Sequence, residues 1–220
     1  MVAIPKTSPK YIPIEPVEIR PQPAAIPPNA DMIMSPFQIR VDNQEKFPWI
    51  FSALAADKVQ TKGGREAYFI VPTVCDSHLD FGDYAIVGLE SYFRAERKSK
   101  EDMYGTIAAF HQHNGEERKK KRLDPDYEIA EHWFARQLQG LNSLTGYGHI
   151  IIECTFPDFL VQPANTQFRP KSASRTILSW MQDYPLVHWH FPGGRRMSEV
   201  LCFRMMQKRY DHLQKVPLSQ

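Results

Sequence analysis

Residues 82–98 are the most informative stretch of this chain, and they read Gly-Asp-Tyr-Ala-Ile-Val-Gly-Leu-Glu-Ser-Tyr-Phe-Arg-Ala-Glu-Arg-Lys. The apolar residues with one glycine in their middle predict two strands that meet in a tight turn at Val87-Gly88-Leu89. Because side chains alternate along a strand, Glu96 and Lys98 should share one face, and Arg97 should point away from it.

Asp83 lies near the start of the first of these strands and can be brought toward Glu96. Two carboxylates and the ammonium of Lys98 would then crowd one sheet edge. Stability does not call for such a cluster, because unpaired charges cost free energy when they lose water. A divalent cation would resolve the clash, and a lysine beside it could orient a water or stabilise a phosphate. The alternative is a surface hairpin with cross-strand ion pairs, each worth about 0.2–1 kcal/mol.

Strand-like and helix-like segments alternate along the rest of the chain without a repeat period. The expected strands cover residues 37–41, 67–74, 148–154 and 185–191, and the expected helices cover residues 48–56, 100–110, 127–141, 172–182 and 198–213. Loops are expected over residues 61–65, 111–126 and 157–171. This alternation predicts one central mixed sheet with helices on both faces, antiparallel at the hairpin and parallel elsewhere.

The composition fits one folded domain with a proline-rich start. Residues 1–36 hold nine of the 18 prolines, so they are expected to be an extended or disordered arm, either a plain tail or a partner-binding segment. The folded domain is expected over residues 37–213, followed by a tail over residues 214–220. With 27 Lys and Arg against 25 Asp and Glu, the net charge of +2 does not demand a polyanion partner, so any nucleic-acid surface must be local.

The cysteines and the hydropathy pattern indicate in which cellular compartment the protein is expected. Cys75, Cys154 and Cys202 are odd in number, widely spaced and in apolar surroundings, which predicts buried thiols rather than disulfides or a thiolate zinc site. No apolar run approaches the length of a membrane span, and no signal-peptide pattern opens the chain. An intracellular protein is expected, cytoplasmic, or nuclear if the organism has a nucleus.

Several motifs, taken in order, resemble one nuclease family. Gly82-Asp83, then Glu96-Arg97-Lys98, then Asp102 resemble the nuclease motif of the XPF-type structure-specific endonucleases, a branch of the restriction-endonuclease-like superfamily. The segment Val41-Asp-Asn-Gln-Glu45 resembles the strand-end Val-Asp-x-x-Glu of that family, and His149-Ile-Ile-Ile-Glu153 resembles its next strand. The resemblance covers roughly residues 37–213, and the ordered combination is more specific than any single motif.

The resemblance implies a three-layer α/β/α sandwich of the restriction-endonuclease-like type, with a mixed central sheet. It also implies metal-dependent hydrolysis of phosphodiester bonds in branched or flapped DNA, in repair or recombination. Asp83 and Glu96 look like ligands of Mg²⁺ or Mn²⁺, with Asp42 and Glu45 in the same acidic pocket. Lys98 looks like the residue that positions the attacking water.

Arg97 and Asp102 also match the motif, which places them among the candidate catalytic residues. The resemblance and the apolar C-terminal helix together suggest a homodimer or heterodimer. Members of the family often carry a tandem helix-hairpin-helix module after the nuclease, and none is expected before Gln220. This departure leaves open a second hypothesis, a catalytically silent nuclease-like module that binds DNA or a partner without cutting.

Asp42, Glu45 and Asp102 have a simpler explanation in helix capping. Asp42 and Glu45 fit the N-cap and third positions before the expected helix at Pro48, and Ser99 and Asp102 repeat that spacing before the next helix. Capping and a role at the metal site both remain open for these acidic residues.

Basic and histidine-rich segments carry weaker signals. The run from Arg118 to Arg122 could contact phosphates, act as a nuclear address, or form a solvated charged loop. His188 and His190 share one strand face and could bind a transition metal, but no third ligand is evident.

Overall fold

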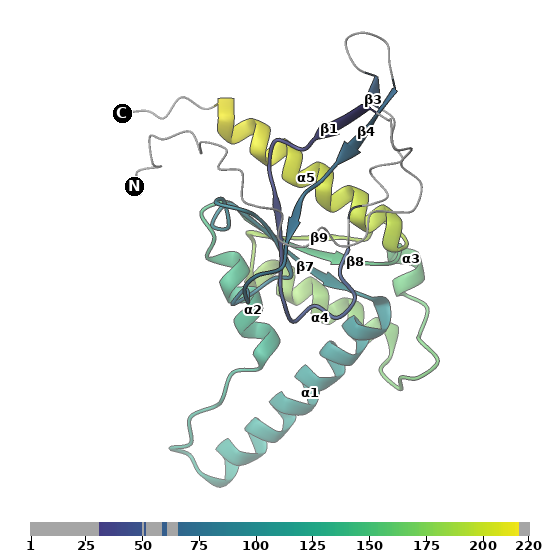
Figure 1. Ribbon diagram of the computed structural model, residues 1–220. Coiled ribbons are helices and arrows are strands. Elements are labelled where there is room, and N and C mark those ends of the chain that lie inside the picture. Colours follow the sequence, from purple (N-terminus) through teal and green to yellow (C-terminus); the bar gives the residue numbers. More distant parts are fainter. Residues whose placement is uncertain (1–30, 50, 52–58, 61–65, 216–220) are drawn as a thin grey trace. The chain divides into compact units, whose positions relative to one another are not determined.

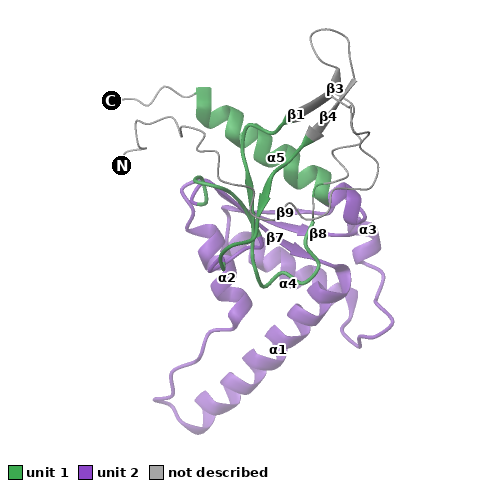
Figure 2. Ribbon diagram, viewed as in Figure 1, with its two compact units in different colours: residues 1–78, 84–90, 199–220 green, residues 79–83, 91–198 purple. Residues whose placement is uncertain are grey.

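The computed structural model describes residues 31–49, 51, 59–60 and 66–215 (Figure 1). The chain divides into two compact units (Figure 2), which are described separately below. Unit 1 comprises residues 1–78, 84–90 and 199–220, and unit 2 comprises residues 79–83 and 91–198. No helix in the described part of the chain is long and apolar enough to span a bilayer.

Unit 1 contains two sets of paired strands. In the first set, β2 (Ile39–Val41) pairs in parallel with β5 (Thr73–Val74) and antiparallel with β6 (Tyr84–Ile86). In the second set, β4 (Glu66–Ile70) pairs in parallel with β1 (Asp31–Met34) and antiparallel with β3 (Val59–Gln60). The antiparallel pairing of β2 with β6 goes beyond the sequence expectation, which placed antiparallel pairing only at the hairpin.

Aromatic contacts hold the core of unit 1 together. Trp49 stacks on Tyr84 with ring centroids 4.7 Å apart, and its backbone N–H donates to the Tyr84 hydroxyl at 2.8 Å. Phe37 stacks on Phe203 of α5 (Arg195–Lys215) at 5.6 Å. The predicted turn at Gly88 is confirmed, because Gly88 has a φ of +77° and the Leu89 N–H donates to the Ile86 carbonyl. The connection between the two strands is longer than the predicted tight hairpin, since β6 ends at Ile86 and the next strand begins at Phe93.

Unit 2 contains three parallel strands in the order β7-β8-β9. They are β7 (Phe93–Lys98), β8 (Tyr147–Ile152) and β9 (Val187–His190). Residues 148–152 of β8 are buried, as expected for a central parallel strand rich in isoleucine. The helices are α1 (Lys100–Leu123), α2 (Trp133–Asn142), the short α3 (Phe156–Phe159) and α4 (Pro170–Asp183).

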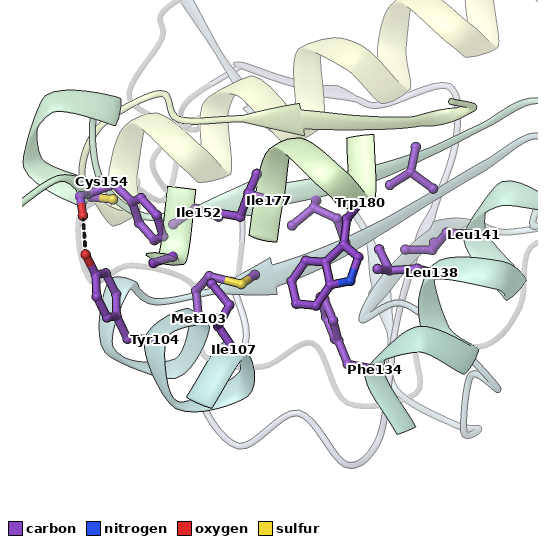
Figure 3. Packing of buried hydrophobic residues seen from close by; sticks show 14 of the residues in the cluster. Met103, Tyr104, Ile107, Phe134, Leu138, Leu141, Ile152, Cys154, Ile177 and Trp180 are labelled. Carbon is purple, nitrogen blue, oxygen red and sulfur yellow. Dashed lines mark hydrogen bonds between the residues drawn. The ribbon is translucent and has the colours of Figure 1, made fainter. Parts of the chain in front are cut away.

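The core of unit 2 lies where α1, α2 and α4 pack on the strands (Figure 3). Its buried side chains include Ile107 from α1, Leu138 from α2, Ile150 from β8, and Ile177 and Trp180 from α4. This dense packing fixes α2 against the strands that carry the charged cluster described below.

Two glycines allow α2 to approach its neighbours closely. A methyl group at Gly140 of α2 would lie 2.4 Å from the Phe81 ring, and one at Gly148 of β8 would lie 2.6 Å from the Leu141 side chain of α2. Only glycine fits at contacts this short.

The predicted α/β class with mixed strand pairing is confirmed. Both units combine strands with helices, and both parallel and antiparallel pairs occur. The strands expected at residues 37–41, 148–154 and 185–191 correspond to β2, β8 and β9, and the helices expected at residues 172–182 and 198–213 correspond to α4 and α5.

Three predicted elements were wrong in extent. Helix α1 runs to Leu123 rather than ending near residue 110, so most of the expected loop over residues 111–126 is helical. Helix α2 begins at Trp133 rather than Tyr127, because side chains of α1 bind the backbone before it in an extended path. Short α3 forms inside the loop expected over residues 157–171.

The strand expected over residues 67–74 is instead two strands, β4 and β5, which belong to different sheets. Pro72 lies between them and has no N–H to donate to a continuing ladder. The helix expected over residues 48–56, the loop over residues 61–65 and most of the arm over residues 1–36 lie largely outside the described residues.

Candidate functional site

Glu96 and Lys98 form a buried ion pair at the end of β7. The Lys98 amine lies 2.7 Å from Oε1 of Glu96, and the two side chains are 15% and 1% exposed. Residues two apart on a strand project from the same face, as the sequence predicted. Arg97 points to the other face, where it contacts Glu153 at the end of the neighbouring strand β8.

Asp83 is tied directly to the strand that carries this pair. One Asp83 carboxylate oxygen accepts the backbone N–H of Arg97 at 2.6 Å, and the Asp83 N–H donates to the Ala95 carbonyl at 2.8 Å. These two bonds hold the Asp83 carboxylate beside the C-terminal end of β7. This position agrees with the expectation that Asp83 lies near Glu96.

Three carboxylates act on the Lys98 amine. Burial alone would lower the pKa of Lys98, but the ion pair with Glu96 and the charges of Asp83 and Asp102 outweigh it, so the pKa is raised above its ordinary value. Three formal negative charges and one positive charge leave a formal charge of −2 on the cluster of Asp83, Glu96, Lys98 and Asp102. We name these four residues the charged cluster.

Asp102 enters the charged cluster from the first turn of α1. Ser99 is the N-cap residue of this helix, and its hydroxyl accepts the Asp102 N–H at 3.0 Å. The predicted capping by Ser99 is therefore confirmed, and Asp102 occupies the third helical position, where negative charge also favours the helix dipole. Asp102 therefore takes part in the N-terminal cap of α1 and also places its charge near Lys98.

Asp42 and Glu45 belong to unit 1, so the structure leaves open their predicted place in the acidic pocket. Asp42 is buried, and its carboxylate accepts the Gln44 N–H at 2.6 Å and approaches His78 Nδ1 at 2.9 Å. Glu45 accepts the Phe47 N–H at 2.8 Å. Both carboxylates brace the turn after β2, which accounts for their residue types on local grounds.

Arg97 has a definite structural partner. Its guanidinium forms a two-point ion pair with Glu153, at 2.8 and 3.0 Å, and both side chains are at least nine-tenths buried. Arg195, at the start of α5, lies 3.6 Å from the same carboxylate. The parallel pairing of β7 with β8 brings Arg97 and Glu153 to one edge.

Two residues of α2 contribute to the site and were missed from the sequence. Gln137 donates to the Glu96 carboxylate, at 3.1 Å to Oε1 and 3.2 Å to Oε2, when its amide is oriented to satisfy both groups. The Trp133 ring centroid lies 5.4 Å from the Lys98 amine, within the range of a cation–π interaction. Their i, i+4 spacing was a usable signal, since it places both on one face of a helix.

The donor chemistry of the charged cluster fits a hard divalent cation. Carboxylate oxygens are the ligands that Mg²⁺ and Mn²⁺ favour, and the excess negative charge would be offset by such an ion. Among the residues that the structure describes, no three His, Cys, Asp or Glu side chains converge closely enough to form a ready metal site. An ion bound here by Asp83 and Glu96 would therefore take several of its ligands from water or substrate.

The histidines of β9 have a partner that the sequence analysis did not supply. His149 Nδ1 of β8 lies 3.1 Å from His190 Nε2, and its ring stacks on Phe93. Burial, and then the nearby His188, lowers the pKa of His190 to about 4, so its imidazole is neutral near pH 7. These rings lie on the face of the strands opposite Glu96 and Lys98, so they are separate from the charged cluster.

Two of the three cysteines are buried thiols, as predicted. Cys154 and Cys202 are buried, and burial raises the pKa of the Cys154 thiol to about 11. Cys75 is exposed in the segment after β5, so the prediction was wrong for this residue. The apolar neighbours of Cys75 in the sequence belong to a short strand that ends at Val74 and leaves the thiol outside the core.

The site therefore consists of strand-end carboxylates gathered around one lysine in an α/β fold. Solved structures of XPF from Aeropyrum pernix are among those that resemble the chain. XPF from Aeropyrum pernix matches with a TM-score of 0.46 and 16% identity, over 80% of this chain and 67% of that chain. XPF from Aeropyrum pernix in complex with DNA matches with a TM-score of 0.46 and 15% identity, over 82% and 68% of the two chains. No protein-family model matches this chain, and no curated protein matches it.

Proposed function

We propose that this protein is a divalent-metal-dependent endonuclease that hydrolyses phosphodiester bonds in branched or flapped DNA. The observation that carries the proposal is the buried 2.7 Å pair of Glu96 with Lys98 at the end of β7, together with the Asp83 carboxylate bonded to the Arg97 N–H of the same strand. A buried lysine held charged by three carboxylates has no evident purpose in stability, because an apolar pair would fill the same space at no greater cost.

Each member of the charged cluster has a chemical task in this proposal. Asp83 and Glu96 supply carboxylate oxygens to Mg²⁺ or Mn²⁺, and the hydrogen bond from Gln137 orients the Glu96 carboxylate. The bound ion would supply Lewis-acid stabilisation of the phosphate and a more acidic water. Lys98, which keeps its proton, acts as a fixed cation beside the phosphate and hydrogen-bonds the attacking water.

Other motif residues act as supports. Arg97 donates its N–H to Asp83 and pairs with Glu153, so it fixes the end of β7 between the two metal-binding carboxylates. Asp102 adds negative charge near Lys98 and occupies the third position of α1, one turn from Ser99. Asp42 and Glu45 are proposed as further acidic groups of the pocket, on the resemblance of their motif.

Cleavage of defined DNA structures tests the proposal. Labelled flap, fork, nicked and intact duplex DNA would be incubated with the protein, with and without Mg²⁺ or Mn²⁺. We expect metal-dependent cuts near the branch, and a loss of at least 100-fold in the Glu96→Gln and Lys98→Met variants. Arg136→Gln is a matched control, because Arg136 is exposed on α2 and lies outside the charged cluster. Equal cleavage by all four proteins would reject the assignment.

A second candidate is a nuclease-like module that binds DNA or a partner without cutting. It is favoured by one observation: Glu96 is almost fully buried and already bonded to Lys98 and Gln137. Such a protein would retain the fold without binding an ion. Calorimetric titration with Mn²⁺ separates the candidates, because only the nuclease should bind the ion in a manner lost in Asp83→Asn.

Assembly into a homodimer or heterodimer, and a role in DNA repair or recombination, are further parts of the proposal. The motif resemblance supports assembly, whereas the apolar stripe of α5 does not, because Phe203 and Met206 are buried and Phe37 packs on Phe203 and Tyr210. Light scattering over a range of protein concentrations tests dimer formation, and a monomer at all concentrations would remove this part.

A further inference from the structure

The outer part of α1 and the segment that follows it form a structure that the proposed active site does not use. We call residues 108–132 the α1 extension, and within it residues 124–132 are the return segment. Between residues 111 and 131 only Glu117 is buried, so the outer part of α1 packs mainly against the return segment. The extension is visible in Figure 1 as the far end of α1 and the chain that leads back toward α2.

The return segment is bound to one face of α1 by polar side chains. The Glu117 carboxylate accepts the Ala130 N–H at 2.8 Å and lies 2.7 Å from the Lys120 amine. His113 Nε2 lies 2.7 Å from the Ala130 carbonyl oxygen, and Lys121 donates to the Tyr127 carbonyl at 2.9 Å. The positions 113, 117, 120 and 121 follow helical spacing, so they define the inner face of the extension.

The opposite face is basic. Arg118, Lys119 and Arg122 are exposed and lie, with Gly115, at the spacing i, i+3, i+4 and i+7 that marks one helix face. No ion pair links these three residues to any residue that the structure describes. Glu116, on the flank, accepts a hydrogen bond from Gln112. The five basic residues are therefore divided, with Lys120 and Lys121 used internally and the other three turned outward.

Gly115 gives a second, independent observation at the same face. A methyl group at Gly115 would meet no atom of the described residues within 4 Å, so none of those residues requires a glycine here. Glycine in an exposed helix interior is unfavourable by about 1 kcal/mol relative to alanine. A glycine beside exposed arginines allows a phosphate backbone to approach the helix closely.

The helix that carries the extension begins at the charged cluster, and the return segment leads back to it. Asp102 in the first turn of α1 acts on Lys98, and Trp133, directly after the return segment, lies 5.4 Å from the same amine. Arg118 and Arg122 follow Asp102 by 16 and 20 residues of one helix. At about 1.5 Å per residue, their backbones lie about 24–30 Å farther along the helix, which is the length of about 7–9 base pairs of duplex.

We infer that Arg118, Lys119 and Arg122 bind the phosphates of a duplex arm of the DNA, about 7–9 base pairs from the phosphate held at the charged cluster. The inference rests on the proposed function, because it takes DNA as the partner. Duplex DNA is the occupant that the charge pattern favours, since it presents phosphates along a straight path that a straight helix can follow. The contact is independent of sequence and sets where the duplex lies relative to the active site.

Binding in the presence of EDTA tests this inference without requiring cleavage. Wild-type protein and the triple variant Arg118→Gln, Lys119→Gln, Arg122→Gln would be titrated into labelled duplex and fork DNA over a series of salt concentrations. We expect the slope of log affinity against log salt to fall in magnitude by about 2.7, or about 0.9 for each lost phosphate contact. A second readout is hydroxyl-radical footprinting, in which the triple variant should lose protection about 7–9 base pairs from the branch.

A matched control removes the same charge from another exposed helix. The variant Arg204→Gln, Lys208→Gln, Lys215→Gln changes three exposed basic residues of α5. An equal change in slope for both triple variants, or no change in either, would overturn the inference. Wild-type protein that shows the expected slopes and footprint but cuts no DNA would leave the inference standing and reject the nuclease proposal.

Discussion

The amine of Lys98 and the carboxylate of Glu96 are 2.7 Å apart at the end of one strand, with 1% of the Glu96 side chain exposed. A carboxylate so deeply buried depends on its partner, since water cannot replace the lysine. The pair is also the centre of the charged cluster. A substitution there affects both the free energy of unfolding and the proposed activity, so both must be measured.

The Glu96→Gln variant should lose stability as well as activity. Removing one member of a buried ion pair costs about 3–5 kcal/mol, and the lower end is expected because Asp83 and Asp102 still face Lys98. The double variant Glu96→Gln, Lys98→Met should recover at least half of the loss. Urea denaturation measures the free energy of unfolding, and a change below about 0.5 kcal/mol in the single variant would contradict this account.

The α1 extension should loosen in acid. Hydrogen bonds from Lys120, from the Ala130 backbone and from Tyr127 lower the pKa of Glu117 to about 2. A lowered carboxyl pKa stabilises the folded state above the unfolded pKa of about 4.3, and this stabilisation is lost as pH falls from there toward 2. The protection of the Ala130 amide against hydrogen exchange, measured relative to the intrinsic exchange rate at each pH, should fall over this range.

Glu117→Gln is the control for that experiment. The variant keeps the size of the side chain but has no titrating group, so the Ala130 amide should be less protected than in wild type near neutral pH, and its protection should not change between about pH 4.3 and about pH 2. An acid dependence that is unchanged in Glu117→Gln would show that another group controls the extension.

Two glycine substitutions should have opposite effects on stability. Gly115→Ala should raise the free energy of unfolding by about 0.5–1 kcal/mol, because the added methyl group meets open space on a helix. Gly140→Ala should lower it by about 1–3 kcal/mol, because the methyl group would overlap the Phe81 ring. Thermal melts of both variants measure the difference, and stabilisation by Gly140→Ala would contradict the packing of α2.

The folded state should also be destabilised by protonation of His190. Burial first, and then His188, lowers the pKa of His190 to about 4, so the unfolded chain takes up this proton at higher pH than the folded chain. The stability attributable to His190 is therefore full above an unfolded pKa of about 6.5 and falls as pH drops toward 4. NMR titration of the imidazole measures the pKa directly, and a value near 6.5 would contradict the buried contact with His149.

The face-sharing of Glu96 and Lys98 could be predicted because it depends only on the two-residue period of a strand. The cap at Ser99 and the turn at Gly88 were predictable for the same reason, since each follows from a residue's own conformational preference. The position of Asp83 depends on how the segment before β6 packs against β7, which local preferences do not determine. The resemblance to the family motif supplied that prediction.

The length of α1 could not be predicted from local pattern. The residues beyond position 110 are mostly polar and lack an apolar stripe, so they resemble a solvated loop. Their helix is stabilised by Glu117 and Lys121, which bind the backbone of a segment that is itself irregular. The contacts of Gln137 with Glu96 and of Glu153 with Arg97 were not predicted for a similar reason, because each depends on how α2 and β8 pack beside β7.

The α1 extension is closed at its base, where the rings of Phe110 and His132 meet edge to face with centroids 5.6 Å apart. The two ends of the α1 extension therefore lie side by side, and the strands of unit 2 do not depend on its length. Adding or deleting one helical turn, with a matching change in the returning chain, would move its tip by about 5.4 Å, or about one and a half base pairs. A change in the length of the α1 extension would thus alter the spacing between its proposed duplex contact and the charged cluster, while leaving unchanged the strand that carries Glu96 and Lys98.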